Sequence, residues 1–137
     1  MSKLNVPVEE FTTPDPVTAT EAMSVTELKS LMAQHGIRHL PVLRAGEVVG
    51  IVSDRDVRVA SGLSAEHSLQ IQATDIMAKT PLTVSANTPL DKAAFLMSEQ
   101  KVGSVLVNDE RGQFLGIFTV TDALNALIEI VRGEEAN

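Results

Sequence analysis

Between residues 24 and 36 the apolar positions recur with the period of a helix. A short strand is predicted at residues 17–19, and Ser24 and Glu27 then have the spacing of a capping box, in which each side chain satisfies the other's backbone N–H. Gly36 suits the left-handed position that follows a helix. A helix with one buried face is therefore predicted between Ser24 and Gly36, with apolar positions at Val25, Leu28, Leu31 and Met32.

Two apolar runs follow this helix, at residues 39–43 and 48–52, and turn residues 44–46 separate them. Their length and β-branched content predict two strands. A further helix is predicted at residues 54–61. Polar residues 62–72 contain no clear period and predict a linker.

The same order of elements returns further along the chain. Residue i matches residue i+65 over residues 16–42, and one extra residue in the next turn changes the offset to 66. In this register G-E-V-V-G-I-V-S-D-R-D, residues 46–56, matches G-Q-F-L-G-I-F-T-V-T-D, residues 112–122. Turns, apolar faces and polar corners that match in one register indicate an internal duplication. In the second copy Thr88 is predicted as a helix cap, with Pro89 at the first helical position.

Each copy has the order β-α-β-β-α within about 45 residues, which is too small to bury a sufficient core alone. The prediction is an α/β (α+β) fold of two repeats packed as one module around a pseudo-twofold axis. The first repeat is assigned to residues 8–61, the linker to 62–72 and the second repeat to 73–132. Before them, the prolines of residues 1–15 predict an extended lead-in with one helical turn near its middle.

Composition excludes several classes of function. The formal net charge of −7 argues against a duplex-binding surface, and four Phe with no Tyr or Trp argue against stacking platforms for single strands. The absence of Cys excludes disulfides and a thiol nucleophile. No apolar run approaches the roughly 20 residues of a membrane span, and the N-terminus lacks a signal-peptide core. We therefore expect a cytoplasmic protein that binds neither nucleic acid nor membrane.

Catalytic and metal-binding patterns are also missing from the sequence. It contains no nucleophile with an adjacent base, no isolated carboxylate pair and no phosphate-binding loop of the P-loop type. The three His do not form a cluster with metal-ligand spacing. The chain is therefore not expected to be an enzyme or to require a cofactor.

The two matching corners, Ser53 with Asp56 and Thr119 with Asp122, have two interpretations. A hydroxyl before a helix and an acid three residues later satisfy free N–H groups, so the corners can be purely structural caps. An ionised carboxylate can also accept hydrogen bonds from both ribose hydroxyls, and the N-terminus of a helix favours phosphate. Both interpretations remain open from spacing alone, and both roles can coexist at one corner.

The order of elements, with G-h-x-h-S/T-x-x-D at the end of each repeat (h is apolar), resembles the cystathionine-β-synthase (CBS) domain. The pair resembles a Bateman module over about residues 8–131. The resemblance implies regulation by adenosine-containing ligands, most often AMP, ADP or ATP, and in some members S-adenosylmethionine, NAD or cyclic dinucleotides. With no catalytic domain attached, the chain resembles a stand-alone CBS-pair protein.

The resemblance also implies roles for individual residues. Asp56 and Asp122 would accept hydrogen bonds from ribose, and Ser53 and Thr119 would contact ribose or phosphate. Backbone groups around the second strand of each repeat would bind the adenine edge. The full candidate set is Thr18, Ile37, Arg38, His39, Pro41, Ser53, Arg55, Asp56, Lys79, Thr83, Val102, Ser104, Thr119, Thr121 and Asp122.

Two unequal sites are expected, because the first repeat carries cations where the second does not. The matched positions are Arg38, His39, Arg55 and Arg58 against Gly103, Ser104, Thr121 and Leu124. The last helix is apolar over more than one packing face, which predicts a homodimer, as in the disc-like assemblies of related CBS pairs.

The sequence therefore predicts a regulator that binds an adenine nucleotide in the cleft between the repeats and modulates an unidentified protein partner. The alternative is a ligand-independent dimerisation or assembly module whose corners are only helix caps.

Overall fold

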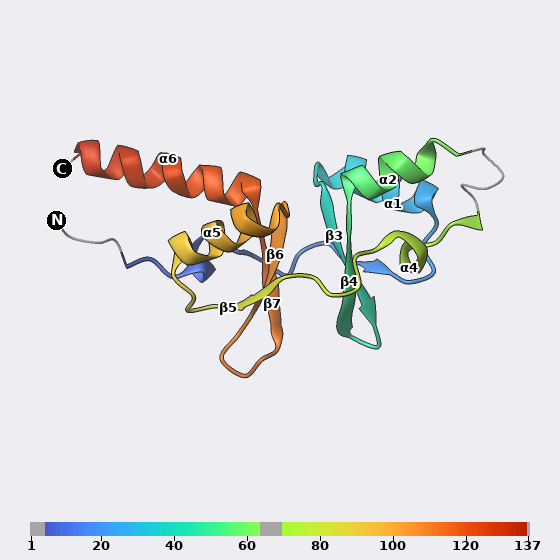
Figure 1. Cartoon of the computed structure of the whole chain (residues 1–137), viewed down its shortest axis with the longest axis horizontal. Coiled ribbons are helices and arrows are strands. Elements are labelled where there is room, and N and C mark those ends of the chain that lie inside the picture. The colour runs from blue at the N-terminus through green and yellow to red at the C-terminus, as the bar shows by residue number, and fades with distance from the viewer. Residues whose placement is uncertain (1–4, 64–69, 137) are drawn as a thin grey trace. The chain divides into compact units, whose positions relative to one another are not determined.

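The computed structural model describes residues 5–63 and 70–136, which divide into two compact units (Figure 1). The first-repeat unit comprises residues 16–81. The second-repeat unit comprises the described residues up to Asp15 together with those from Leu82 onward. Part of the linker predicted from the sequence, residues 64–69, lies outside the described residues.

The first-repeat unit has a three-stranded sheet in the order β2-β3-β4, with β2 parallel to β3 and β3 antiparallel to β4. Its elements are β2 (Ala19–Thr20), α1 (Val25–His35), β3 (His39–Arg44), β4 (Glu47–Ser53), α2 (Asp54–Ser61) and α4 (Ala73–Ile76). Alternate residues of the two long strands point into the core against the helices. The core includes Val25, Leu28, Leu40, Val42, Val52 and Val57.

The second-repeat unit repeats this arrangement and adds a fourth strand, in the order β1-β7-β6-β5. Its elements are η1 (Val8–Phe11), β1 (Thr13–Pro14), β5 (Thr83–Ser85), α5 (Leu90–Gln100), β6 (Ser104–Asn108), β7 (Phe114–Thr119) and α6 (Val120–Ala136). Its core includes Val8, Val84, Val105, Val107 and Phe118. The duplicated mixed α/β fold predicted from the sequence is confirmed.

Helix α1 begins and ends as its sequence predicts. The Ser24 hydroxyl accepts a hydrogen bond from the Glu27 N–H at 3.1 Å, and Gly36 adopts the left-handed conformation with φ of 62°. In the second repeat Lys101 takes the equivalent left-handed position, with φ of 56°. Both helices therefore end with the same left-handed backbone conformation, although only the first repeat has a glycine at that position.

The predicted cap at Thr88 is wrong. Helix α5 begins at Leu90, and Pro89 precedes it with an extended backbone (ψ 138°) and no side-chain cap. The Thr88 hydroxyl lies 3.0 Å from the hydroxyl of Ser85, so it closes the turn before the helix. Because Pro89 is extended, Thr88 is one residue too far from the helix to cap it.

A leader segment, residues 5–15, precedes the first repeat in sequence but packs in the second-repeat unit. The Val8 N–H donates to the Thr88 carbonyl at 2.8 Å, and the Leu90 N–H donates to the Val6 carbonyl at 2.8 Å. The side chain of Val8 is fully buried in that unit. These contacts place residues 8–15 outside the repeat to which the sequence analysis assigned them.

A second leader segment, residues 71–80, precedes the second repeat and packs in the first-repeat unit. Its bonds are the counterparts of those above at an offset of 65. The Ala73 N–H donates to the Met23 carbonyl at 2.8 Å, and the Val25 N–H donates to the Ile71 carbonyl at 3.2 Å. Each unit is thus completed by the leader segment of the other repeat.

The repeated glycine of the sequence motif lies where a leader segment crosses a strand. Beside Gly50, residues Ile51 and Ala78 exchange N–H to carbonyl bonds of 3.0 and 2.9 Å. A Cβ at Gly50 would lie 2.8 Å from the Ala78 carbonyl oxygen, and one at Gly116 would overlap the Thr13 carbonyl. Close packing of the leader segment, and not a ligand, accounts for these two glycines.

Substitution of Gly116 by Ala is expected to destabilise the protein by about 1–3 kcal/mol, because the added methyl group forces the leader segment away from β7. Urea unfolding measures this. Gly133→Ala is the control, because a Cβ there meets no heavy atom within 4 Å and Ala favours a helix by about 1 kcal/mol over Gly. If Gly116→Ala were as stable as the wild type, the close contact between Gly116 and the leader segment at Thr13 would be contradicted.

Candidate functional site

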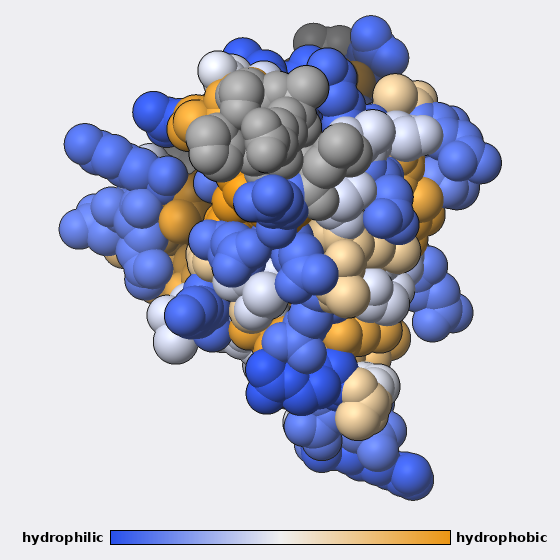
Figure 2. Space-filling model, turned by 90° about the vertical axis from the view of Figure 1, so that its right-hand side faces the viewer, coloured by the Kyte–Doolittle hydropathy of each residue, from blue (hydrophilic) through white to orange (hydrophobic). Residues whose placement is uncertain are grey.

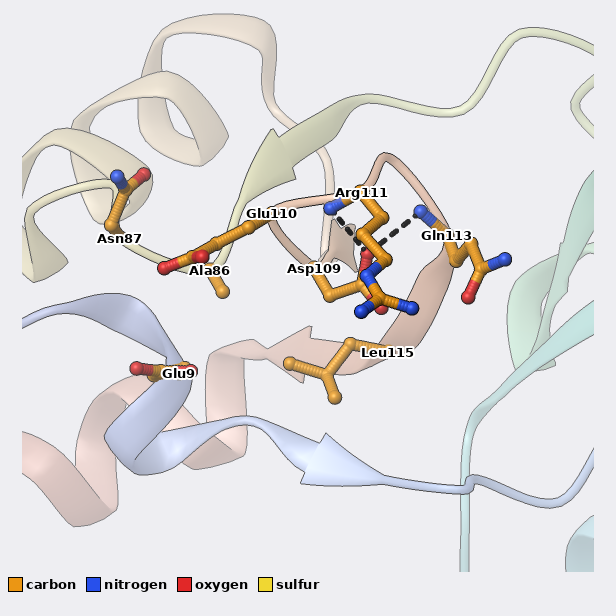
Figure 3. Close-up of a pocket in the computed structure, with 8 residues that line it drawn as sticks. All are labelled: Glu9, Ala86, Asn87, Asp109, Glu110, Arg111, Gln113 and Leu115. Atoms are coloured by element: carbon orange, nitrogen blue, oxygen red, sulfur yellow. Dashed lines mark hydrogen bonds between the residues drawn. The ribbon is translucent and has the colours of Figure 1, made fainter.

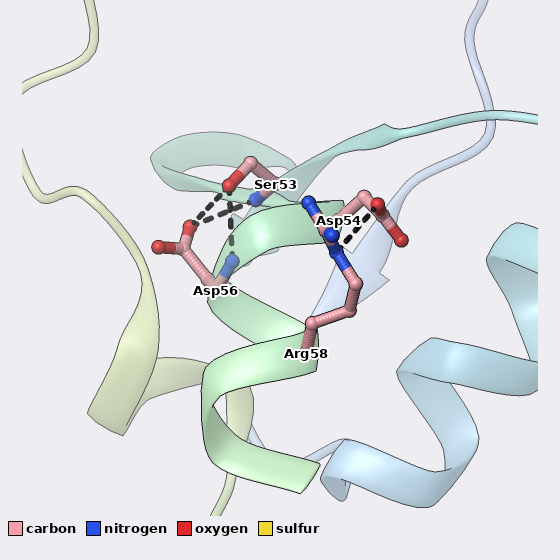
Figure 4. Close-up of polar contacts among 4 residues, drawn as sticks. All are labelled: Ser53, Asp54, Asp56 and Arg58. Carbon is pink, nitrogen blue, oxygen red and sulfur yellow. Dashed lines mark hydrogen bonds and ion pairs between the residues drawn. The ribbon is translucent and has the colours of Figure 1, made fainter. Parts of the chain in front are cut away.

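The first candidate corner lies where β4 ends and α2 begins. The Ser53 N–H and hydroxyl both donate to the Asp56 Oδ2 atom at 2.9 Å, and the Asp56 N–H donates to the Ser53 Oγ atom at 3.2 Å (Figure 4). Both residues are half-buried. The corner is therefore a complete capping box that fixes the rotamer of the carboxylate.

The second candidate corner, between β7 and α6, has the same geometry. The Thr119 N–H and hydroxyl donate to the Asp122 Oδ2 atom at 2.8 and 3.0 Å, and the Asp122 N–H donates to the Thr119 Oγ1 atom at 3.3 Å. The structural interpretation of the motif thus holds at both corners.

The capping role uses only one oxygen of each carboxylate. Among the described residues, no hydrogen bond is recorded to the Oδ1 atom of Asp56 or of Asp122. Each corner therefore holds an oriented, half-buried acceptor that can take a hydroxyl donor from a ligand without loss of the cap.

The start of β3 lies beside the first corner. His39 is the register partner of Ser53, and the Arg38 carbonyl accepts the Asp54 N–H at 2.7 Å. The corresponding pair in the second-repeat unit is Ser104 and Thr119. The structure therefore brings the predicted strand residues together with the predicted corner residues in each unit.

Positive charge gathers at the first corner. Arg38 and Arg55 are exposed, and no ion pair is recorded for either within the described part of the chain. Arg58 differs, because its Nε atom lies 3.1 Å from Asp54 Oδ2, as Figure 4 shows. At least two guanidinium groups are thus available beside Asp56.

The second corner carries no cation at the matched positions. Ser104 is 8% exposed where His39 stands in the first repeat, and Thr121 and Leu124 occupy the exposed positions of Arg55 and Arg58. The two corners therefore differ in charge at equivalent positions, as the sequence predicts.

Burial lowers the pKa of His39 below its usual value of 6.5. The carboxylates of Asp56 and Asp54 oppose this shift, while the Arg38 guanidinium adds to it. The neutral imidazole is therefore favoured in the folded protein, so at neutral pH His39 contributes a hydrogen-bonding group to the corner more readily than a charge.

The remaining predicted residues lie along the neighbouring strands. Thr18 directly precedes β2, Thr83 begins β5, and Pro41 is buried in β3 opposite Ile51. Ile37 and Val102 precede β3 and β6 and are partly exposed or exposed. These residues can offer backbone groups to a ligand. The side chain of Pro41 is fully buried and does not reach the surface.

Lys79 is not brought to the first corner. Ala78 bridges Ile51 in the antiparallel direction, so the residue after Ala78 continues toward Gly50 and away from Ser53. Its exposed side chain has no recorded ion pair among the described residues. The ligand role that the family resemblance implies for Lys79 stays a prediction.

One backbone hydrogen bond distinguishes the two repeats. The Leu106 N–H donates to the Leu82 carbonyl at 2.8 Å. The equivalent residues are Pro41 and Val17, and proline has no amide hydrogen to donate. The Val17 carbonyl therefore lacks the donor that its counterpart has.

A pocket of about 360 Å³ in the second-repeat unit was not predicted from the sequence (Figure 3). Glu9, Asp109 and Glu110 contribute carboxylates to its lining, and Asp109 Oδ1 accepts the N–H groups of Arg111 and Gln113 at 2.9 Å each. Arg111 is the one cation among the described lining residues, so three carboxylates leave the lining net negative, which disfavours a phosphate group there.

The sequence does contain a signal for this pocket. In the first repeat the equivalent space is bridged by Glu21 and Arg44, which form an ion pair of 2.6 Å. The second repeat has Ala86 and Asp109 at those positions. Both of these shorter side chains line the pocket.

The described residues contain neither a membrane-spanning helix nor a cluster of metal ligands. Within residues 5–63 and 70–136, no helix has the length and apolarity needed to cross a bilayer. In the same residues no three His, Asp or Glu side chains are grouped as a metal ion would require.

Comparison with known proteins identifies the family. The CBS domain model matches residues 8–62 and 73–129, which is most of the chain. The chain belongs to the CBS domain family. The two matched segments correspond to the two repeats recognised from the sequence, and the resemblance is confirmed.

Solved CBS structures share the fold over nearly the whole chain. A protein assigned to acetoin utilization (AcuB) from Vibrio cholerae is 27% identical with a TM-score of 0.84, covering 98% of both chains. CBSX2, solved in complex with AMP, is 29% identical with a TM-score of 0.77, covering 90% of this chain and 97% of its own. The CBS domain pair of protein MJ0100, in complex with 5′-methylthioadenosine and S-adenosyl-L-methionine, is 26% identical with a TM-score of 0.79 and the same coverage.

Curated relatives include longer enzymes. An inosine-5′-monophosphate dehydrogenase of Korarchaeum cryptofilum is 34% identical over 122 residues, 89% of this chain and 24% of the enzyme. An L-aspartate semialdehyde sulfurtransferase of Methanocaldococcus jannaschii is 29% identical over 84% of this chain and 22% of the enzyme. The chain thus spans about a quarter of the length of these relatives. A CBS domain-containing protein of Dictyostelium discoideum is 33% identical over 76% of this chain and 78% of its own.

The His39 environment predicts a pH dependence of stability. The unfolded chain takes up the proton at the higher pKa, so the folded state loses stability as pH falls below about 6.5. The His39→Gln variant is expected to lose less unfolding free energy between pH 7.5 and 5.5 than the wild type, measured by urea unfolding at each pH. His35→Gln, an exposed control, should keep the wild-type difference. Identical pH profiles for wild type and His39→Gln would refute the assignment.

Proposed function

We propose that this CBS pair is a regulatory module that binds an adenosine-containing ligand, with AMP, ADP or ATP as the first candidates. The binding groups are Ser53 and Asp56 in one unit and Thr119 and Asp122 in the other. The observation that carries the proposal is the duplicated corner, in which one carboxylate oxygen holds the cap and the other accepts no recorded hydrogen bond in the described residues. Solved relatives that hold AMP or S-adenosyl-L-methionine with 5′-methylthioadenosine support the ligand class.

The chemistry of the corner suits a ribose. The two bonds to Asp56 Oδ2 fix the carboxylate in advance, so a ligand does not have to order it on binding. The Oδ1 atom then accepts ribose hydroxyls, and a hydrogen bond to a charged acceptor is stronger than one between neutral groups. The same argument applies to Asp122.

The surroundings of the two corners favour different ligands. Arg38 and Arg55 place exposed guanidinium groups beside the first corner, where they can pair with phosphate oxygens. Ser104 and Thr121 offer only hydroxyl groups at the second corner. We therefore assign the more highly phosphorylated nucleotide to the first corner.

Regulation requires that the ligand bind one conformation of the chain better than another. The nucleotide acts in this proposal as a regulatory ligand and not as a cofactor, and its output is a changed affinity for a protein partner. In two relatives a segment similar to this chain forms about a quarter of an enzyme. This association supports an enzyme as the protein partner.

The second candidate function is a ligand-independent assembly module. Two observations favour it: both capping boxes are complete without a ligand, and α6 exposes a row of apolar side chains. Self-association as a homodimer is compatible with both candidates, so only ligand binding separates them.

A thermal-shift panel with AMP, ADP, ATP, S-adenosylmethionine, NAD and cyclic di-AMP tests the proposal. A ligand at a hundred times its Kd stabilises the folded state by about 2.7 kcal/mol, so at least one should raise the Tm of the wild type. Asp56→Asn or Asp122→Asn is expected to abolish the shift, each compared with its own ligand-free Tm.

Asp75→Asn is the matched control for this panel. The Asp75 carboxylate accepts the Gln72 N–H at 2.9 Å, so this variant removes a similar helix-start bond outside both corners. It should keep the ligand-induced shift. A wild type whose Tm moves with no ligand of the panel would overturn the proposal in favour of the assembly module.

A further inference from the structure

A histidine lies beside the first corner and has no counterpart at the second. His39 begins β3 and is the register partner of Ser53 across the antiparallel pair. Directly opposed residues of such a pair share one face of the sheet, so the imidazole lies on the same face as the Ser53 hydroxyl. The matched residues of the second-repeat unit are Ser104 and Thr119, neither of which changes its charge near neutral pH.

His39 is partly buried, whereas Arg38 and Arg55 beside the same corner are exposed. Figure 2, viewed from the side of the first-repeat unit, shows hydrophilic residues over most of the visible surface. The next alternate residues of β3, Leu40 and Val42, belong to the core, so His39 lies on the opposite face of the strand. Burial at this position favours the neutral imidazole while no ligand is bound.

The charges around His39 oppose one another. Asp56 and Asp54, at the start of α2, favour the protonated imidazole, and Arg38, directly before β3, disfavours it. The neighbouring strands add no charge at this point, because β4 contributes Ser53 and β2 consists of an alanine and a threonine. A further negative charge placed at the corner therefore shifts the balance toward the protonated form.

We propose that His39 takes up a proton when a phosphate-bearing nucleotide occupies the first corner, so that this corner binds the nucleotide more tightly as pH falls. The inference rests on the proposed function, in which Arg38 and Arg55 pair with the phosphate oxygens. That pairing offsets the repulsion by Arg38 and brings the negative charge of the phosphates close to the imidazole. The proton comes from solvent and adds to a ring nitrogen, and no bond of the nucleotide forms or breaks.

Proton and nucleotide assist each other in this scheme. A ligand that raises the proton affinity of a group is itself bound more tightly, by the same factor, once that group is protonated. Uptake of one proton changes the affinity by at most about tenfold per pH unit. The second corner has Ser104 in place of His39 and therefore lacks this dependence. The module thus responds to acidification through one of its two corners.

Isothermal titration calorimetry with ATP tests the proposal in an Asp122→Asn background, in which only the first corner keeps its ribose acceptor. From pH 7.5 to 6.0 the Kd of ATP is expected to fall by about threefold or more. Binding at pH 6.5 should take up protons, measured as the difference in heat between two buffers of unequal ionisation enthalpy. Adding His39→Gln should remove both effects, because glutamine forms hydrogen bonds but cannot take up a charge.

His35→Gln in the same background is the matched control. His35 is exposed at the end of α1, so this variant should keep the pH dependence and the proton uptake. The ionisation of ATP itself is common to all variants and cancels when they are compared.

The outcomes separate this inference from the proposed function. If ATP binds without proton uptake, or if His39→Gln keeps the uptake, the inference is overturned while nucleotide binding stands. If only the wild type binds ATP and the Asp122→Asn background does not, the nucleotide occupies the second corner, which also overturns the inference. If the wild type binds no ATP at either pH, the inference and the assignment of a phosphorylated nucleotide to the first corner are both overturned.

Discussion

The antiparallel contact between each leader segment and the last strand of a unit is the constraint on which the rest of the structure depends. It adds an edge partner beside Ile51 in one unit and Ile117 in the other. It also requires a glycine at positions 50 and 116, because any side chain there would occupy the space of the leader backbone. The corner that follows three residues later is held in place by this same strand.

At each corner, stability and the capacity to bind depend on the same carboxylate, through its two different oxygens. The carboxylate that accepts the N–H group of the capping residue with one oxygen is also the one whose second oxygen is available to a ligand. Any substitution of Asp56 or Asp122 therefore changes the helix start and the available acceptor together. For this reason a change in Tm caused by a ligand, and not the Tm itself, reports binding.

The elements set by local chemistry were predictable from the sequence, because caps, turns and apolar periods act over a few residues. The spacing of Ser24 and Glu27 predicted their capping box, and the spacing at the two matched corners gave capping as one of two interpretations. The contacts of the leader segments were not predictable, because their partners are between 27 residues (Ala78 and Ile51) and 104 residues (Thr13 and Ile117) away in the sequence. Nothing in residues 8–15 indicates which sheet edge they join. The acidic pocket was missed because its signal is a pair of shorter side chains, Ala86 and Asp109, which is visible only when they are compared with Glu21 and Arg44.

The exchange of leader segments also bears on how such a chain can arise. A single repeat with its own leader needs a second copy to supply the segment that pairs with its last strand, and two copies can supply it to each other. Joining the two genes head to tail keeps every one of these contacts and makes them intramolecular. In such a chain the surfaces of the two halves can differ, as residues 58 and 124 do, but neither half can be lost without taking away the segment that pairs with the last strand of the other.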